Sequence, residues 1–188
     1  MEALLTSVVA VTLAEIGDKT QLLSLVLITR FRQPWPIIVG IFVATIANHA
    51  LAGLVGAEVG AWLGPNLLRW IVGIGFLAMA AWTLIPDKLD EDERPPTRGA
   101  FVTALIAFFL AEMGDKTQLA TIGLAAAHPG QTAWVILGTT IGMMLANVPV
   151  VLLGDRIAGR VKVSSVRFLA AALFAAFGAL VLWRGVGG

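Results

Sequence analysis

Apolar residues along this chain gather in long runs that short polar segments interrupt. Six runs stand out, at residues 3–28, 36–60, 67–85, 99–125, 132–154 and 166–183. Each approaches or exceeds the roughly 20 residues with which a helix crosses a hydrocarbon core of about 30 Å. A membrane β-barrel would instead show alternating segments of about 10 residues. The pattern therefore predicts an all-α integral membrane protein with six transmembrane helices.

Composition supports a chain surrounded by membrane lipid. Of 188 residues, 58% are hydrophobic and 13% are charged, and the mean hydropathy is +0.88, whereas soluble domains are about 25% charged. The net charge of +1 provides no basic face for phosphate, so we expect no nucleic-acid partner. Without cysteine and with only two histidines, the sequence excludes a thiolate site and argues against a histidine-rich metal site.

A decapeptide occurs twice. Residues 13–22 read LAEIGDKTQL and residues 110–119 read LAEMGDKTQL, so nine of ten letters agree at a spacing of 97. Each copy lies on the first predicted helix of one half of the chain, residues 1–85 or 99–188, and residues 86–98 form an acidic linker. Because each half has three helices, the second half enters the membrane from the opposite side. We therefore expect two three-helix repeats of inverted topology.

Orientation follows from the basic residues. Nine Lys and Arg residues fall in the first, third and fifth loops, and two fall on the opposite side. Because short loops rich in these residues stay in the cytoplasm, we expect both termini outside the cytoplasm and the 86–98 linker inside. The first residues, MEALLTSVVA, lack a basic segment, so a cleavable signal peptide is not expected.

Four carboxylates fall near the predicted membrane centre: Glu15, Asp18, Glu112 and Asp115. On continuous helices, each motif would place its glutamate, aspartate and lysine on one face. A charge at this depth costs about 2.5–3.5 kcal/mol, so these groups must face inward and be compensated. Lys19 and Lys116 leave a formal charge of −2, which one divalent cation or two protons would balance.

A structural interpretation of the same residues competes with this one. Glu15 with Lys19, and Glu112 with Lys116, could be i,i+4 ion pairs that only hold helices together. The duplication, and an aspartate outside each such pair, favour a cation site.

Four amides are further candidate metal ligands: Gln21, Gln118, Asn48 and Asn147. Each could instead form hydrogen bonds between helices. Carboxylate and amide oxygens suit calcium, magnesium or manganese better than copper or zinc.

Small residues accompany the motifs and the helices after them. For Gly17 and Gly114 we favour close helix packing over an irregular backbone. Glycine and alanine recur every four residues from Gly40 to Gly60 and from Gly138 to Ala146, which predicts close approach of other helices. His49 has no histidine counterpart in the second half, and a proton-relay role for it is the less favoured interpretation.

At E-x-G-D-K-T, residues 15–20 and 112–117, the sequence resembles the GDT-type cation/proton exchangers, the family of Golgi manganese and calcium transporters with bacterial members. The resemblance covers the whole chain. It implies secondary transport of Mn²⁺ or Ca²⁺ against protons, with the four motif carboxylates as metal-binding residues and no resident cofactor. The short chain is similar to bacterial manganese exporters, which implies an inner-membrane protein that serves metal homeostasis.

The alternatives are a Ca²⁺/H⁺ antiporter, an intramembrane metal-dependent hydrolase and a scaffold subunit. Carboxylate and amide oxygens accept both Mn²⁺ and Ca²⁺, so the sequence separates the first alternative poorly. A hydrolase would not need two symmetric copies of its site, and no histidine pair completes a catalytic metal site. We therefore expect a transporter and not an enzyme.

Overall fold

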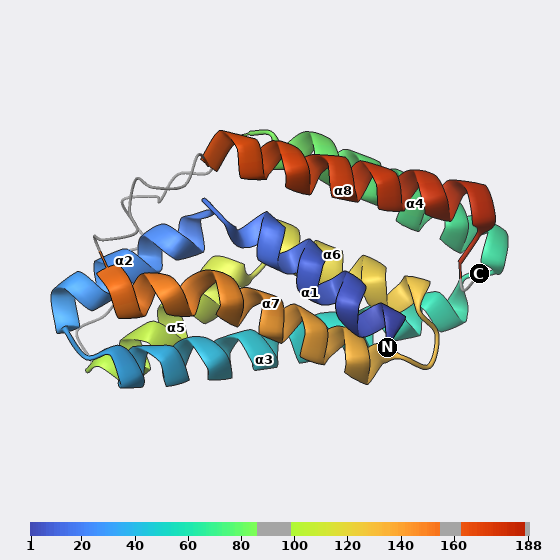
Figure 1. The fold of residues 1–188 in the computed structure, drawn as a ribbon. Helices are drawn as coiled ribbons and strands as arrows, with labels where there is room; N and C mark the ends of the chain where they lie inside the picture. The colour runs from blue at the N-terminus through green and yellow to red at the C-terminus, as the bar shows by residue number, and fades with distance from the viewer. Residues whose placement is uncertain (86–98, 155–162, 187–188) are drawn as a thin grey trace.

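The structure, a computed structural model, describes residues 1–85, 99–154 and 163–186. The described residues form eight helices and no strand (Figure 1). The helices are α1 (Glu2–Glu15), α2 (Lys19–Phe31), α3 (Pro34–Trp62), α4 (Pro65–Thr83), α5 (Ala100–Glu112), α6 (Lys116–Ala127), α7 (Thr132–Leu153) and α8 (Val163–Arg184). The predicted acidic linker, residues 86–98, lies outside the described residues.

Both copies of the motif interrupt a helix that the sequence predicted to be continuous. α1 ends at Glu15 and α2 begins at Lys19, and α5 and α6 are separated in the same way. Gly17 has φ 83° and Gly114 has φ 77°, which L side chains adopt only at a cost. A Cβ on Gly114 would meet nothing within 4 Å. Helix packing was therefore the wrong interpretation for Gly114, and at both positions glycine allows the backbone to turn.

Membrane-spanning length is found in four of the described helices, α3, α4, α7 and α8, and α5 is a shorter apolar helix. α1 and α2 have 14 and 13 residues, and they follow one another across the molecule in Figure 1. α5 and α6 cross it in the opposite direction. The chain is thus an all-helical membrane protein in which both copies of the motif separate two shorter helices.

The two halves use equivalent contacts. α1 packs against α7, and α5 packs against α3. A Cβ on Gly138 of α7 would lie 2.6 Å from the Leu4 carbonyl oxygen of α1, and one on Gly40 of α3 would lie 2.8 Å from the Phe101 carbonyl oxygen of α5. These positions therefore admit no side chain, which confirms the predicted close approach at the glycine stripes.

Two apolar clusters lie on either side of the breaks. One contains residues of α1, α4, α6 and α8, the other contains residues of α2, α3 and α5, and α7 contributes to both. α4 and α8 pack closely, because a Cβ on Gly178 would lie 2.8 Å from the Gly73 carbonyl oxygen. This helix pair lies over α1 and α6, and α2 extends beyond it (Figure 1).

Candidate metal-binding site

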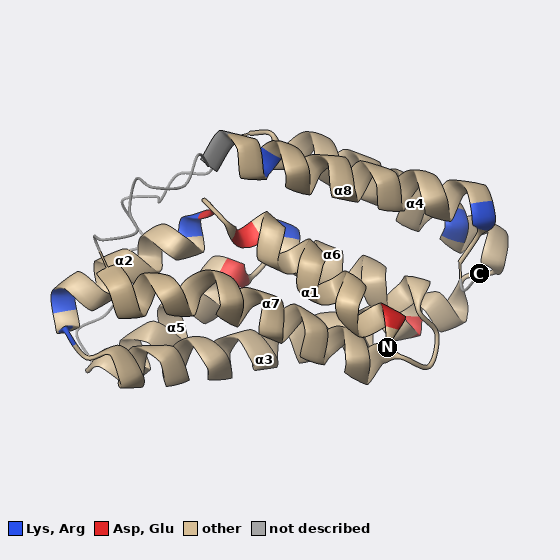
Figure 2. Cartoon of the chain, in the orientation of Figure 1, with Lys and Arg blue, Asp and Glu red and all other residues tan. Residues whose placement is uncertain are grey.

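The two helix breaks bring carboxylates of both motifs together. Glu15 ends α1, Glu112 ends α5 and Asp115 precedes α6. One carboxylate oxygen from each of the three lies within 4.8 Å of the others, and all three residues are buried. In Figure 2 the charged segments beside the breaks lie near the middle of the molecule, far from the charges at its ends. Residues 97 positions apart thus form one cluster.

Each glutamate keeps one oxygen available. Thr20 Oγ1 donates to Glu15 Oε2 at 2.5 Å, and Thr117 Oγ1 donates to Glu112 Oε2 at 2.5 Å. The other oxygen of each glutamate, Oε1, is buried and has no hydrogen-bond partner among the described residues. A buried carboxylate oxygen without a partner is costly, so a cation or a proton would relieve both.

Sequence reasoning missed the two threonines, because on a continuous helix they point away from the glutamate five residues earlier. The break redirects each threonine toward the glutamate of its own motif. The sequence held one signal of this role, because the threonine is present in both copies of the motif.

The lysines connect the two motifs instead of pairing within one. Lys116 Nζ lies 2.8 Å from Asp18 Oδ1, and Lys19 Nζ lies 3.8 Å from Asp115 Oδ1. The competing interpretation, a Glu15–Lys19 pair, is therefore wrong, and so is the expectation that the aspartates stand outside the ion pairs. The reason is that the break separates the glutamate from the helix that carries the lysine.

The glutamines brace the breaks. Gly17 N–H donates to Gln21 Oε1 at 2.8 Å, and Gly114 N–H donates to Gln118 Oε1 at 2.7 Å. The Gln21 amide nitrogen donates to the Ala146 carbonyl oxygen at 2.9 Å. Each glutamine therefore ties its own turn to another part of the chain, and its role as a metal ligand stays a prediction.

Both asparagines are buried and hydrogen-bonded. Asn48 Oδ1 accepts from Gln118 Nε2, and Asn48 Nδ2 donates to the Phe109 carbonyl oxygen, each at 2.9 Å. Asn147 Oδ1 accepts from Ser24 Oγ at 2.9 Å. Asn48 thus supports the second motif through Gln118, and a direct contact of either asparagine with a metal stays a prediction.

His49 lies beside Asn48 on α3 and is fully buried. Neither ring nitrogen has a hydrogen-bond partner in the described part of the chain. No contact that the structure gives links it to the carboxylates, so the relay role also stays a prediction.

The cluster has the chemistry of a site for a hard divalent cation. Its candidate ligands are carboxylate oxygens, and the lysines already offset the aspartates to which they are paired. The glutamates are then the charges still to be balanced. One divalent cation or two protons would do so.

The family model described as "Divalent cation/proton antiporter GDT1" matches the chain twice, at residues 3–91 and 100–188. The chain therefore belongs to the GDT1 family, and it is a transporter and not an enzyme.

Relatives cover almost the whole chain. A Vibrio cholerae protein described as "Putative manganese exporter" is 55% identical, over 93% of this chain and 87% of its own length. A GDT1-like protein of Synechocystis is 27% identical over 97% of this chain and 98% of its own, and GDT1-like protein 5 of Arabidopsis thaliana is 29% identical over 88% and 89%. No solved structure matches the chain.

Proposed function

We propose that this protein exports Mn²⁺ from the cytoplasm in exchange for protons. Membership of the GDT1 family supports cation/proton exchange, and the name of the Vibrio relative supports manganese. The observation that carries the proposal is the pair of glutamates, each buried with one oxygen open, within one three-carboxylate cluster.

The exchange uses the two glutamates as the shared site. Mn²⁺ binds Glu15 and Glu112, and Asp115 completes the cluster. When the metal leaves, protons take its place on the same oxygens. Thr20 and Thr117 hold the glutamates in position through the second oxygen of each. Metal and protons therefore exclude each other without any large change in the charge of the site.

The architecture that we propose is six membrane crossings in two inverted repeats, residues 1–85 and 99–188. α1–α2 and α5–α6 are the broken crossings, and broken helices at mid-membrane sites are typical of such transporters. Their opposite directions in Figure 1, and the equivalent α1–α7 and α5–α3 contacts, support the inversion.

For orientation, we propose an inner-membrane protein with both termini outside the cytoplasm. Because the chain has no cysteine, a single cysteine introduced at Asp92 reports from which face of the membrane a thiol reagent reaches the 86–98 linker. We expect labelling from the cytoplasmic face. Labelling from outside would overturn the orientation.

The transport experiment uses purified protein in liposomes with an imposed proton gradient, and it follows Mn²⁺ and proton movement together. Glu112→Gln keeps the shape of the side chain and removes its charge, so we expect metal-coupled proton flux to be lost. Glu58→Gln is the matched control, because Glu58 lies near the end of α3 outside the cluster. Adding Ca²⁺ as a competitor tests the Ca²⁺/H⁺ alternative. Wild-type flux in a well-folded Glu15→Gln, Glu112→Gln double variant would refute the proposal.

A further inference from the structure

The two ion pairs of the site differ although the two motifs otherwise match. The threonine–glutamate bonds are 2.5 Å in both copies, the glycine–glutamine bonds are 2.8 and 2.7 Å, and ψ of the aspartates is 168° and 170°. Yet Lys116–Asp18 measures 2.8 Å with side chains 4% and 1% exposed, and Lys19–Asp115 measures 3.8 Å with side chains 19% and 4% exposed. Because the motifs differ only at Ile16 and Met113 and their backbones match, the cause lies outside the motifs.

The lysine of the shorter, more buried ion pair also lies on the helix that is more fully covered by other helices. Lys116 begins α6, and α6 is covered by α4 in one apolar cluster with α1 and α8. Lys19 begins α2, whose buried residues Leu23 and Leu27 belong to the other cluster, which contains no described residue of α4 or α8. The α4–α8 pair thus covers α6, the helix whose lysine is in the closed ion pair.

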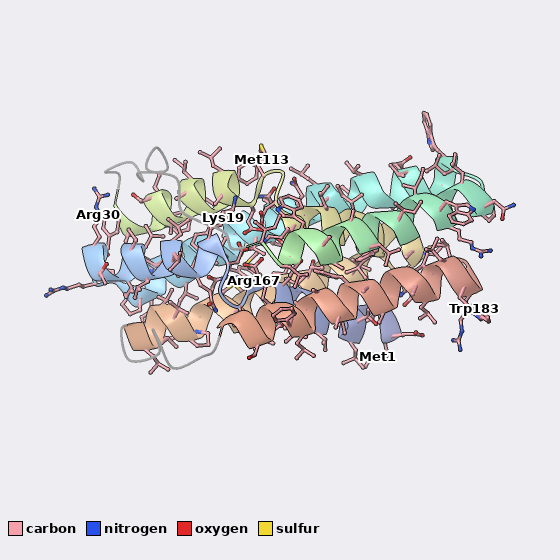
Figure 3. The ribbon with its side chains drawn as sticks, turned by 90° about the horizontal axis from the view of Figure 1, so that it is seen from above. Met1, Lys19, Arg30, Met113, Arg167 and Trp183 are labelled. Atoms are coloured by element: carbon pink, nitrogen blue, oxygen red, sulfur yellow. The ribbon has the colours of Figure 1, made fainter. Side chains whose placement is uncertain are left out.

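Figure 3 shows how far this cover extends. Arg167, near the start of α8, lies at about the same level along the molecule as Lys19 and Met113, near the middle of its length. Trp183, near the other end of α8, lies at the end of the molecule where Met1 lies. The helix pair therefore reaches from the N-terminal end to the level of the site, and α2 lies beyond its reach.

We propose that Lys116–Asp18 and Lys19–Asp115 are two gates that close alternately, and that the α4–α8 pair moves between the two halves to close them. This inference rests on the proposed exchange function. In the present state the gate formed by Lys116 is closed and the gate formed by Lys19 is loosened, while the carboxylates of both pairs stay buried. In the opposite state the α4–α8 pair has shifted toward α2, Lys19 closes on Asp115, and Lys116 releases Asp18.

The roles of the two lysines follow from burial. Removing one partner of a buried ion pair is strongly destabilising, whereas an exposed pair contributes little. Lys116→Gln therefore weakens the present state and favours the opposite one. Lys19→Gln weakens the opposite state, in which its own pair is the closed one. Two variants with the same chemical change should thus shift one equilibrium in opposite directions.

The test uses spin labels on the cysteine-free chain, at Thr29 of α2 and Phe168 of α8, which are both exposed. Pulsed electron–electron double resonance in liposomes gives the distribution of distances between the two spin labels. We expect Lys116→Gln to enrich a shorter distance, as α8 moves onto α2, and Lys19→Gln to deplete it. Asp18→Asn breaks the same pair from its other side and should act as Lys116→Gln does. Lys116→Arg should restore the original distribution.

Arg69→Gln, which removes a positive charge of α4 outside both pairs, is the control and should leave the distribution unchanged. Shifts in the same direction for both lysine variants, or no shift in either, would overturn the gating proposal. Flux of the unlabelled wild type is measured in parallel. If it exchanges metal for protons while the distributions fail to diverge, only the gates are refuted, whereas absent wild-type exchange refutes the proposed function itself.

Discussion

Lys116 Nζ lies 2.8 Å from Asp18 Oδ1, so the lysine of the second motif neutralises the aspartate of the first. The reciprocal contact, Lys19 with Asp115, is longer and more exposed. Because each motif supplies the counter-ion of the other, neither half holds a compensated set of charges by itself. The duplicated sequence is thus one site made of two copies, and the two glutamates are the groups left for the transported ions.

Crossed pairing predicts an energetic coupling between Asp18 and Lys116. In a double-mutant cycle of Asp18→Asn and Lys116→Gln, contacting residues typically couple by about 0.5–3 kcal/mol. We expect a coupling in this range from thermal unfolding in detergent. The control cycle is Glu15→Gln with Lys19→Gln, the pair expected from helical spacing, for which we expect a smaller value. A larger coupling in the control cycle would contradict the crossed arrangement.

The helix break predicts an unusual sensitivity at Gly114. Its φ of 77° is left-handed, and an L side chain there costs roughly 1–2 kcal/mol. Since a Cβ would meet nothing within 4 Å, Gly114→Ala tests the backbone alone. We expect lower thermal stability and slower exchange. Gly75→Ala is the matched control, because its Cβ also meets nothing but its backbone is helical. Equal effects in the two variants would show that the turn does not need glycine.

Hydrophobic patterning was sufficient to predict the positions of the long apolar helices. The predicted run 36–60 is α3, Pro34–Trp62, and 132–154 is α7, Thr132–Leu153. The length and apolar character of a run largely determine where such a helix lies, and prolines and glycines at the ends of the run limit where the helix can begin and end. The ends differ by a few residues because apolar character does not stop where helical hydrogen bonding does.

The breaks could not be predicted by the same reasoning. A glycine inside a helix costs only about 1 kcal/mol, so Gly17 within an apolar run is compatible with a continuous helix or a turn. What decides is the contact with the rest of the fold: Gln21 Oε1 accepts a hydrogen bond from Gly17 N–H, and the Gln21 amide nitrogen donates to the Ala146 carbonyl oxygen of α7. The same holds for the lysines, whose partners are 96 and 98 residues away and are set by how the halves meet.

Gln118 offers a test of bracing against direct metal binding. Gln118→Met keeps a similar volume but leaves Gly114 N–H and Asn48 Oδ1 without their partner. A buried group left unsatisfied, as Asn48 Oδ1 would be, costs about 1–3 kcal/mol, so we expect a loss of thermal stability. Mn²⁺ affinity, measured by calorimetry, should fall less than in Glu112→Gln. Gln131→Met, at the start of α7, controls for loss of an amide. A fall in affinity as large as that of Glu112→Gln would make Gln118 a ligand.

The charge count at the site predicts the stoichiometry of exchange. The lysines are held by the aspartates, and the two glutamates each have one open oxygen, so the site alternates between one Mn²⁺ and two protons. Both loads carry two positive charges, and their exchange therefore moves no net charge across the membrane. In liposomes whose membrane potential is set with potassium and valinomycin, we expect the rate of Mn²⁺ movement to be independent of the potential and to follow the proton gradient alone. Lys116→Gln removes one fixed positive charge, which a further proton can replace on the returning step, so this variant should acquire a dependence on the potential. Potential-dependent exchange by the wild type would mean that the aspartates also release protons. The proposal that only the glutamates take up the transported ions would then be wrong.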